Sequence, residues 1–257
     1  MTIGVISTAA NCGSSTAAIC MAHALSLAQN EGIMLTATSR GEAAADYLGF
    51  DRESRNFGQV IKLLESGVVG AEELIDYTVD IAENLHYINV CGETSSEEVK
   101  LATILRLLKI FPAEYKIIDI KQGFDQEFAR SILDVCDVIV CVCTMHNGDY
   151  DILKKWIDTE LWPKDKQHML LINFYDPEIS SVKAIARFAG YSERNTCKIH
   201  YSPYITKMCN KGELDTLVPA IERGDPRVLE LSNDFREIVQ FITSINMRIA
   251  KWGGKTV

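Results

Sequence analysis

The chain has no Cys-x-x-Cys pair, no long apolar run, and no basic residue ahead of its first apolar stretch. A helix needs about 20 consecutive apolar residues to span a bilayer, so we expect no such span. The start of the chain also lacks the basic region of a secretory signal peptide. We therefore predict a cytoplasmic protein.

Basic residues are scarce as well. The chain carries 26 Lys+Arg against 35 Asp+Glu, which gives a formal net charge of −9. A domain built to neutralise phosphates along DNA carries the opposite sign, so we expect DNA not to be the main ligand. Apolar residues make up 47% of the 257 residues, enough to bury a core. We predict one domain that covers residues 1–257.

The cysteines show no spacing typical of a metal site. No histidine or second cysteine pair lies at ligand spacing from any of them, so we interpret them as small buried apolar side chains. Two of them lie two residues apart in an apolar run and would share one face of a strand. The eight are Cys12, Cys20, Cys91, Cys136, Cys141, Cys143, Cys197 and Cys209.

Apolar runs of strand length alternate with helical patterns along the chain. This alternation predicts an α/β fold, with a doubly wound, mostly parallel sheet and helices on both faces. Expected strands are 3–8, 33–38, 86–92, 116–120, 137–144, 168–175 and one within 196–205. Expected helices are 16–30, much of 41–86 including one in 71–85, 95–111, 128–136, 149–162, 180–190 and 232–252.

The loop after the first expected strand, residues 7–16, has the strongest chemical signal. Small residues there lead from a strand into a helix N-terminus, where backbone N–H groups and the helix dipole favour an anion. Gly13, Ser15 and Thr16 follow the Walker A pattern, whose lysine reaches the outer phosphates and whose hydroxyl reaches Mg²⁺. Ser14 stands where that lysine would be, and residues 7–16 contain no basic group.

These segments resemble the ParA/MinD family of P-loop ATPases over nearly the whole chain. The family's loop, Lys-Gly-Gly-x-Gly-Lys-Thr-Thr, falls on residues 9–16, and its Walker B strand resembles YKIIDIKQG at 115–123. LLINFYD at 170–176 and HYSPYI at 200–205 are similar to two later segments of the family. Both loop lysines are replaced, by Ala9 and Ser14, and Thr36-Ala37-Thr38 replaces an Asp-x-Asp.

The resemblance implies a nucleotide site. It implies phosphate binding by Asn11, Cys12, Gly13, Ser14, Ser15 and Thr16, and contacts to the adenine by Asn173 and Pro203. It also implies that Ser15 and Asp119 serve Mg²⁺, with Asp119 as the catalytic or switch residue. Asn11 can take the left-handed conformation that glycine supplies in the family. Two alternatives stay open: ATP or ADP with Mg²⁺ as cofactor, or none, with Asp119 capping the turn at 121–125.

Two functions follow from the resemblance. One is a spatial organiser or scaffold with a degenerate P-loop, which dimerises and binds protein partners with little or no ATP hydrolysis. The alternative is an active ATPase that serves partitioning, pilus assembly or conjugation. The atypical TadZ or CpaE-like relatives of such systems tolerate altered loops.

The end of the chain carries an amphipathic pattern. Apolar residues recur at helical spacing from Phe235 to Trp252, and Arg248, Lys251 and Lys255 make this end basic. A final helix packed on the sheet explains the pattern. The alternative is an interfacial helix, since MinD-type proteins carry one, which would place the protein peripherally at the inner face of the membrane.

Overall fold

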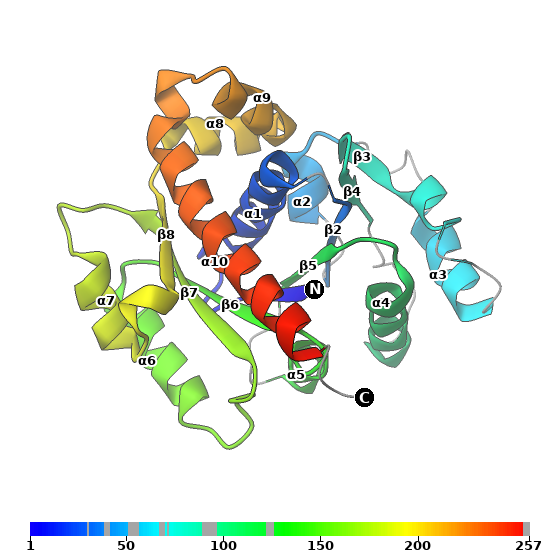
Figure 1. Cartoon of the computed structure of the whole chain (residues 1–257), viewed down its shortest axis with the longest axis horizontal. Coiled ribbons are helices and arrows are strands. Elements are labelled where there is room, and N and C mark those ends of the chain that lie inside the picture. Colours follow the sequence, from blue (N-terminus) through cyan, green and yellow to red (C-terminus); the bar gives the residue numbers. More distant parts are fainter. Residues whose placement is uncertain are drawn as a thin grey trace.

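An eight-stranded sheet organises the chain in the order β3-β4-β2-β5-β1-β6-β7-β8 (Figure 1). The computed structural model describes residues 1–29, 31–38, 42–50, 57–66, 70, 72–88, 97–121 and 126–253. All the strand pairs are parallel except β3 with β4. The strands are β1 (Thr2–Ser7), β2 (Ile33–Ala37), β3 (Val79–Ala82), β4 (Leu85–Tyr87), β5 (Tyr115–Ile120), β6 (Val138–Cys143), β7 (Gln167–Tyr175) and β8 (Thr196–His200).

Helices cover both faces of this sheet. The α-helices are α1 (Ser14–Ala28), α2 (Glu42–Tyr47), α3 (Phe57–Ser66), α4 (Glu97–Ile110), α5 (Glu127–Leu133), α6 (Asn147–Ile157), α7 (Val182–Ala189), α8 (Pro203–Lys211), α9 (Leu217–Glu222) and α10 (Leu229–Gly253). Short 3-10 helices are η1 (Ile75–Tyr77), η2 (Glu193–Asn195), η3 (Leu214–Thr216) and η4 (Pro226–Val228). None of the helices in these described parts is long and apolar enough to traverse a bilayer.

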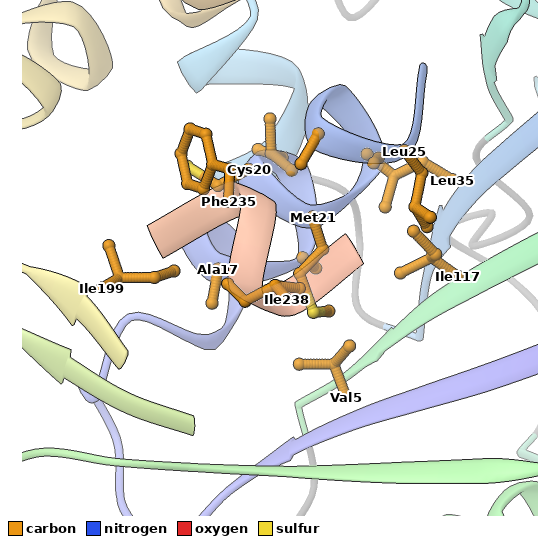
Figure 2. Close-up of a cluster of buried hydrophobic side chains, with 14 of the residues drawn as sticks. Val5, Ala17, Cys20, Met21, Leu25, Leu35, Ile117, Ile199, Phe235 and Ile238 are labelled. Carbon is orange, nitrogen blue, oxygen red and sulfur yellow. The ribbon is translucent and has the colours of Figure 1, made fainter. Parts of the chain in front are cut away.

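Two apolar layers result, one on each face. The first lies under α1, α2, α8, α9 and α10, and the second under α3, α4, α5, α6 and α7. Figure 2 shows the first layer, where Phe235 and Ile238 of α10 lie beside Cys20 and Met21 of α1. Strands buried on both faces read as continuous apolar runs, and every residue of β6 is buried. The predicted α/β fold with a mostly parallel sheet is confirmed.

Some predicted elements are wrong. A helix was expected within 71–85, but the chain there forms only the 3-10 turn η1 and then β3, the first strand of an antiparallel hairpin. The helix expected over 149–162 ends at Ile157. The strand expected within 196–205 ends at His200, and α8, which was not predicted, begins at Pro203. Most of the expected strand 86–92 lies outside the described residues.

The C-terminal helix packs against the domain over most of its length. Five of its apolar residues, Phe235, Ile238, Val239, Ile242 and Ile245, are 9% exposed or less and belong to the same apolar layer as α1. Figure 1 shows α10 running alongside α1. This supports the packed-helix interpretation as far as Ile245; the side chains of Ile249 and Trp252 lie outside the described residues.

Most of the described thiols are buried, as predicted. Six described cysteines are buried, and Cys209 is intermediate. Cys141 and Cys143 lie in the same apolar layer, on one face of β6. No cluster of potential metal ligands occurs among the residues that the structure describes. Cys91 lies outside them.

Candidate nucleotide site

The loop after β1 lies where the connections of the sheet diverge. Strands β1 and β6 are neighbours, yet α1 packs in one apolar layer and α6 in the other. In open α/β sheets, ligands bind at the carboxyl ends of strands at such a point. The loops after β1 and β6 therefore form the edge of the sheet that is best placed for a ligand.

Two residues turn this loop into the helix by adopting left-handed conformations. Asn11 has φ 66° and Gly13 has φ 79°. The conformation expected for Asn11 is thus confirmed. Gly13 is the N-cap of α1, and because glycine has no side chain, it cannot accept hydrogen bonds from the first-turn N–H groups. Those N–H groups are available to an anion at the helix N-terminus.

Gly13 is also the residue that this packing requires. A Cβ atom added there would lie 2.2 Å from Asn173 Nδ2 and 3.2 Å from Phe174 Cζ. Asn173, near the end of β7, donates a hydrogen bond from Nδ2 to the carbonyl oxygen of Cys12 at 2.9 Å. Its buried amide thus holds the loop. The amide implied to contact adenine lies directly against the phosphate loop.

Beneath the loop, Ser15 and Asp119 form a buried polar pair. Ser15 Oγ donates to Asp119 Oδ2 at 2.5 Å, and both residues are buried. Burial raises the pKa of Asp119, while the hydroxyls of Ser15 and Ser14 and the charge of Lys121 oppose that shift. Among the residues that the structure describes, Asp119 Oδ1 has no hydrogen-bond partner. The two residues implied to serve Mg²⁺ are thus adjacent.

A second carboxylate, in the helix that follows β6, contacts the loop. Asp149, in the first turn of α6, accepts hydrogen bonds from Thr144 N at 2.8 Å and Thr144 Oγ1 at 2.7 Å. Cys12 Sγ donates to the same oxygen, Asp149 Oδ2, at 3.6 Å. Asp149 was not among the predicted site residues, because only the adjacency of β1 and β6 brings it to the loop. Its place at the first residue of the helix expected over 149–162, directly after the strand-to-helix turn, was the available signal.

The other predicted site residues lie at the same edge of the sheet. Ser14 is buried, and Thr16 Oγ1 lies 4.0 Å from Cys209 Sγ of α8. Pro203 is exposed at the first position of α8, after the N-cap Ser202. In place of the family's acids, Thr38 accepts a hydrogen bond at Oγ1 from the backbone N–H of Lys121 at 3.0 Å. The turn that Asp119 was alternatively expected to cap lies mostly outside the described residues.

These residues fit a nucleotide through shape and hydrogen bonding more than through charge. The left-handed loop and the uncapped helix N-terminus suit phosphate oxygens. The unpartnered Asp119 Oδ1 and the Ser15 hydroxyl are the oxygen atoms that Mg²⁺ prefers. Lys121 is exposed, and its positive charge lowers the pKa of Asp119.

Comparison with known proteins places the fold. No protein-family model and no curated protein sequence matches the chain. A ParA family ATPase from Chlorobium tepidum has 16% identity and a TM-score of 0.70, over 93% of this chain and 97% of that chain. The cell-division protein MinD of Aquifex aeolicus has 17% identity and a TM-score of 0.70, over 95% and 96%. A putative plasmid partition protein from Borrelia burgdorferi, bound to AMPPNP, has 16% identity and a TM-score of 0.67, over 95% and 98%.

Proposed function

We propose that this chain, which has the fold of the ParA/MinD ATPases, is a spatial organiser that binds an adenine nucleotide with little or no hydrolysis. Nucleotide binding would favour a homodimer that recruits protein partners in the cytoplasm. The observation that supports this proposal is the loop itself. Its left-handed Asn11 and Gly13 present the N-terminus of α1 at the carboxyl edge of the sheet, over the Ser15–Asp119 pair.

Binding would depend on backbone N–H groups. The loop lacks both lysines, and each lost charged hydrogen bond costs about 1.5–3 kcal/mol. At about 1.4 kcal/mol per tenfold, two such losses would weaken triphosphate binding by about a hundredfold or more. We therefore expect affinities nearer the millimolar range of metabolites than the range of a tight nucleotide switch.

Hydrolysis would suffer more than binding. Phosphoryl transfer depends on positioning and on charge that neutralises the outer phosphate. Here the loop lysines and the acids of the second strand are replaced together, and Thr38 instead holds the backbone of Lys121. These replacements favour a role in which the nucleotide is a structural ligand.

The second candidate is an active ATPase, and the Ser15–Asp119 pair favours it. This pair keeps a hydroxyl and a buried carboxyl at the two positions that the family resemblance assigns to Mg²⁺. An active enzyme would then need a cation from outside residues 7–16, from Lys121 or from the partner copy in a dimer.

Calorimetric titration with Mg-ATP and Mg-ADP, followed by size measurement of the same samples, tests the proposal. We expect saturable ATP binding, a shift toward dimer, and phosphate release no faster than in buffer. A turnover that disappears in Asp119→Ala would favour the ATPase instead. Absence of binding up to millimolar ATP, with an unchanged oligomer, would contradict both candidates.

The alternative of a peripheral membrane role depends on the C-terminal end of α10. The face of α10 from Phe235 to Ile245 is taken up by the core, so only the end of the helix is left for a lipid surface. Equal co-sedimentation with anionic vesicles of the full chain and a chain ending at Asn246 would remove this alternative.

A further inference from the structure

An apolar hollow lies between the second half of α1 and the first half of α10. Its volume is about 210 Å³, and Ala24 and Ala28 of α1 line one side of it. Phe235 and Val239 of α10 line the other side, together with Ile221 of α9. We call this space the α1–α10 hollow.

The hollow is recessed and separate from the candidate nucleotide site. Ala24, Phe235 and Val239 are each 9% exposed or less, whereas Ala28 is exposed and lies at the mouth. Ala24 and Ala28 are one turn apart, and each supplies only a methyl group, so the space between the two helices is not filled. Ser15 precedes Ala24 by nine residues, about 14 Å along the helix.

One edge of the hollow is polar. Ser232, Arg236 and Gln240 line this edge and follow one another at four-residue spacing, so they form a row along α10. Arg236 is exposed, and its Nη1 donates a hydrogen bond to Asn233 Oδ1 at 3.3 Å. This partner is neutral, so the positive charge of the guanidinium is not balanced there.

The acids that flank Arg236 on α10 pair with β8 instead. Asp234 Oδ2 lies 2.8 Å from His200 Nδ1, and Asp234 Oδ1 lies 3.6 Å from Lys198 Nζ. Glu237 Oε2 accepts a hydrogen bond from Lys198 Nζ at 2.8 Å. Within the part of the chain that the structure describes, Arg236 therefore has no ion pair. A guanidinium is suited to bind a carboxylate through two parallel hydrogen bonds.

We propose that the α1–α10 hollow binds the tail of a small alkanoate, a linear alkyl carboxylate, whose carboxylate pairs with Arg236. A single cation at the edge of an apolar hollow is complementary to one negative charge on one apolar tail. By proportion to an apolar cavity of about 150 Å³, which holds benzene, the hollow suits a tail of about eight carbon atoms. A protein partner would need about 800 Å² on this chain, and the hollow supplies only a small part of that area.

The size of the hollow sets how affinity depends on tail length. Burial of each additional CH₂ group improves affinity by up to about fourfold. We expect this gain from butanoate to octanoate, where the tail fills the hollow. Decanoate should gain less than about twofold over octanoate, because its extra carbons remain in water.

Two variants and two matched controls test the carboxylate and the tail separately. Arg236→Gln removes the charge, and its control is Arg187→Gln, at an exposed arginine on α7. Ala28→Phe fills the hollow from its exposed mouth, and its control is Ala184→Phe, at an exposed alanine on α7. Octanoate and octanol are the probes in calorimetric titrations of the full chain without nucleotide, and thermal denaturation reports folding.

We expect the unmodified chain to bind octanoate about tenfold more tightly than octanol, which has the same tail and no charge. Arg236→Gln should weaken octanoate binding by about tenfold and leave octanol binding unchanged. Ala28→Phe should weaken the binding of both probes by at least about tenfold with Tm unchanged. Both control variants should bind like the unmodified chain.

Absence of octanoate binding up to about 10 mM would overturn this inference. Binding that is unchanged in both Arg236→Gln and Ala28→Phe would overturn it too, since the ligand would then lie on another surface. So would a dimer of the unmodified chain that Ala28→Phe disrupts without any binding of octanoate, because a second copy would then occupy the hollow. These titrations contain no nucleotide, so their outcome is independent of the proposed function.

Discussion

The hydroxyl of Ser15 donates to the carboxyl of Asp119 at 2.5 Å, and this bond joins the first turn of α1 to the end of β5. Both side chains are buried, and Asp119 is only 2% exposed. A buried carboxyl without a nearby cation favours its neutral form. The pair therefore connects two elements of the fold and also contains a carboxyl whose protonation depends on the charges around it. A bound cation here would change the protonation of Asp119.

The substitution Asp119→Asn tests the charge of this pair. Burial, the largest influence, raises the pKa of Asp119, so the fold prefers the neutral acid. Stability from a group with a raised folded-state pKa is fully present below its unfolded-state pKa and is lost as pH rises through the folded-state pKa. We therefore expect Asp119→Asn to raise Tm at pH 7 and to match the unmodified chain near pH 3.

The companion variant for this pair is Ser15→Ala. It removes the donor and leaves the buried carboxyl without that hydrogen bond, so we expect a loss of about 1 kcal/mol in urea denaturation at pH 7. An Asp119→Asn variant that is less stable than the unmodified chain at pH 7, by an amount that shrinks toward pH 3, would mean that the carboxyl is ionised in the folded protein.

Gly13→Ala and Gly190→Ala separate two effects of adding a Cβ atom. Gly190→Ala introduces backbone strain alone, and Gly13→Ala adds steric crowding to the same strain. Both glycines have φ 79°, but a Cβ at Gly190 meets nothing within 4 Å, whereas one at Gly13 would lie 2.2 Å from Asn173 Nδ2. We expect about 1–2 kcal/mol of destabilisation for Gly190→Ala, from the left-handed conformation. Gly13→Ala should cost at least about 1 kcal/mol more, because Asn173 must release Cys12. Equal losses in urea denaturation would contradict the packing of Asn173 on the loop.

Lys121→Ala tests the source of counter-charge. Lys121 is exposed and follows β5 directly. Its charge lowers the pKa of Asp119, so it acts electrostatically on the buried carboxyl beneath the loop. If it neutralises the outer phosphates, its loss should weaken ATP binding by about tenfold and leave AMP binding unchanged. Lys183→Ala, on the exposed side of α7, is the control in the same titrations. A parallel loss for ATP and AMP would show that Lys121 acts on folding instead.

The parallel core of the sheet could be predicted because strands buried on both faces leave continuous apolar runs. Residues 137–144 are of this kind and form β6. The antiparallel edge could not be predicted, because β3, Val79–Ala82, has only four residues, too few for a strand period to stand out from the helical pattern expected around it. Helix α8 was missed for a similar reason: among its nine residues only Ile205 and Met208 are buried.

The candidate site was predictable only where local chemistry decides conformation. Asn11 was expected to be left-handed because its short polar side chain tolerates that region, and it is. The contact of Cys12 with Asp149 spans 137 positions and depends on which strands are neighbours. The left-handed Phe174 has no local signal at all, since bulky residues avoid that conformation. Tertiary packing imposes it.

His23 provides the clearest acid sensitivity. It lies on α1 with 1% exposure, and neither ring nitrogen has a hydrogen-bond partner among the described residues. Burial lowers its pKa from 6.5 to about 4, because the charged ring cannot be solvated. The folded protein therefore binds fewer protons than the unfolded chain between these values. Stability from this group is present above pH 6.5 and falls as the pH drops toward 4, by about 3 kcal/mol.

Replacing His23 with leucine should remove that loss. We expect His23→Leu to be at least as stable as the unmodified chain at pH 7, because two unpartnered nitrogens leave the core. Its free energy of unfolding should also fall less steeply between pH 7 and pH 4.5 in urea denaturation. Met21→Leu, buried on the same helix, changes packing without a titrating group and should keep the original slope. If the free energy of unfolding of His23→Leu keeps the original slope against pH as well, other groups cause the acid sensitivity. His23 is then reached by water in the folded protein, where it is protonated.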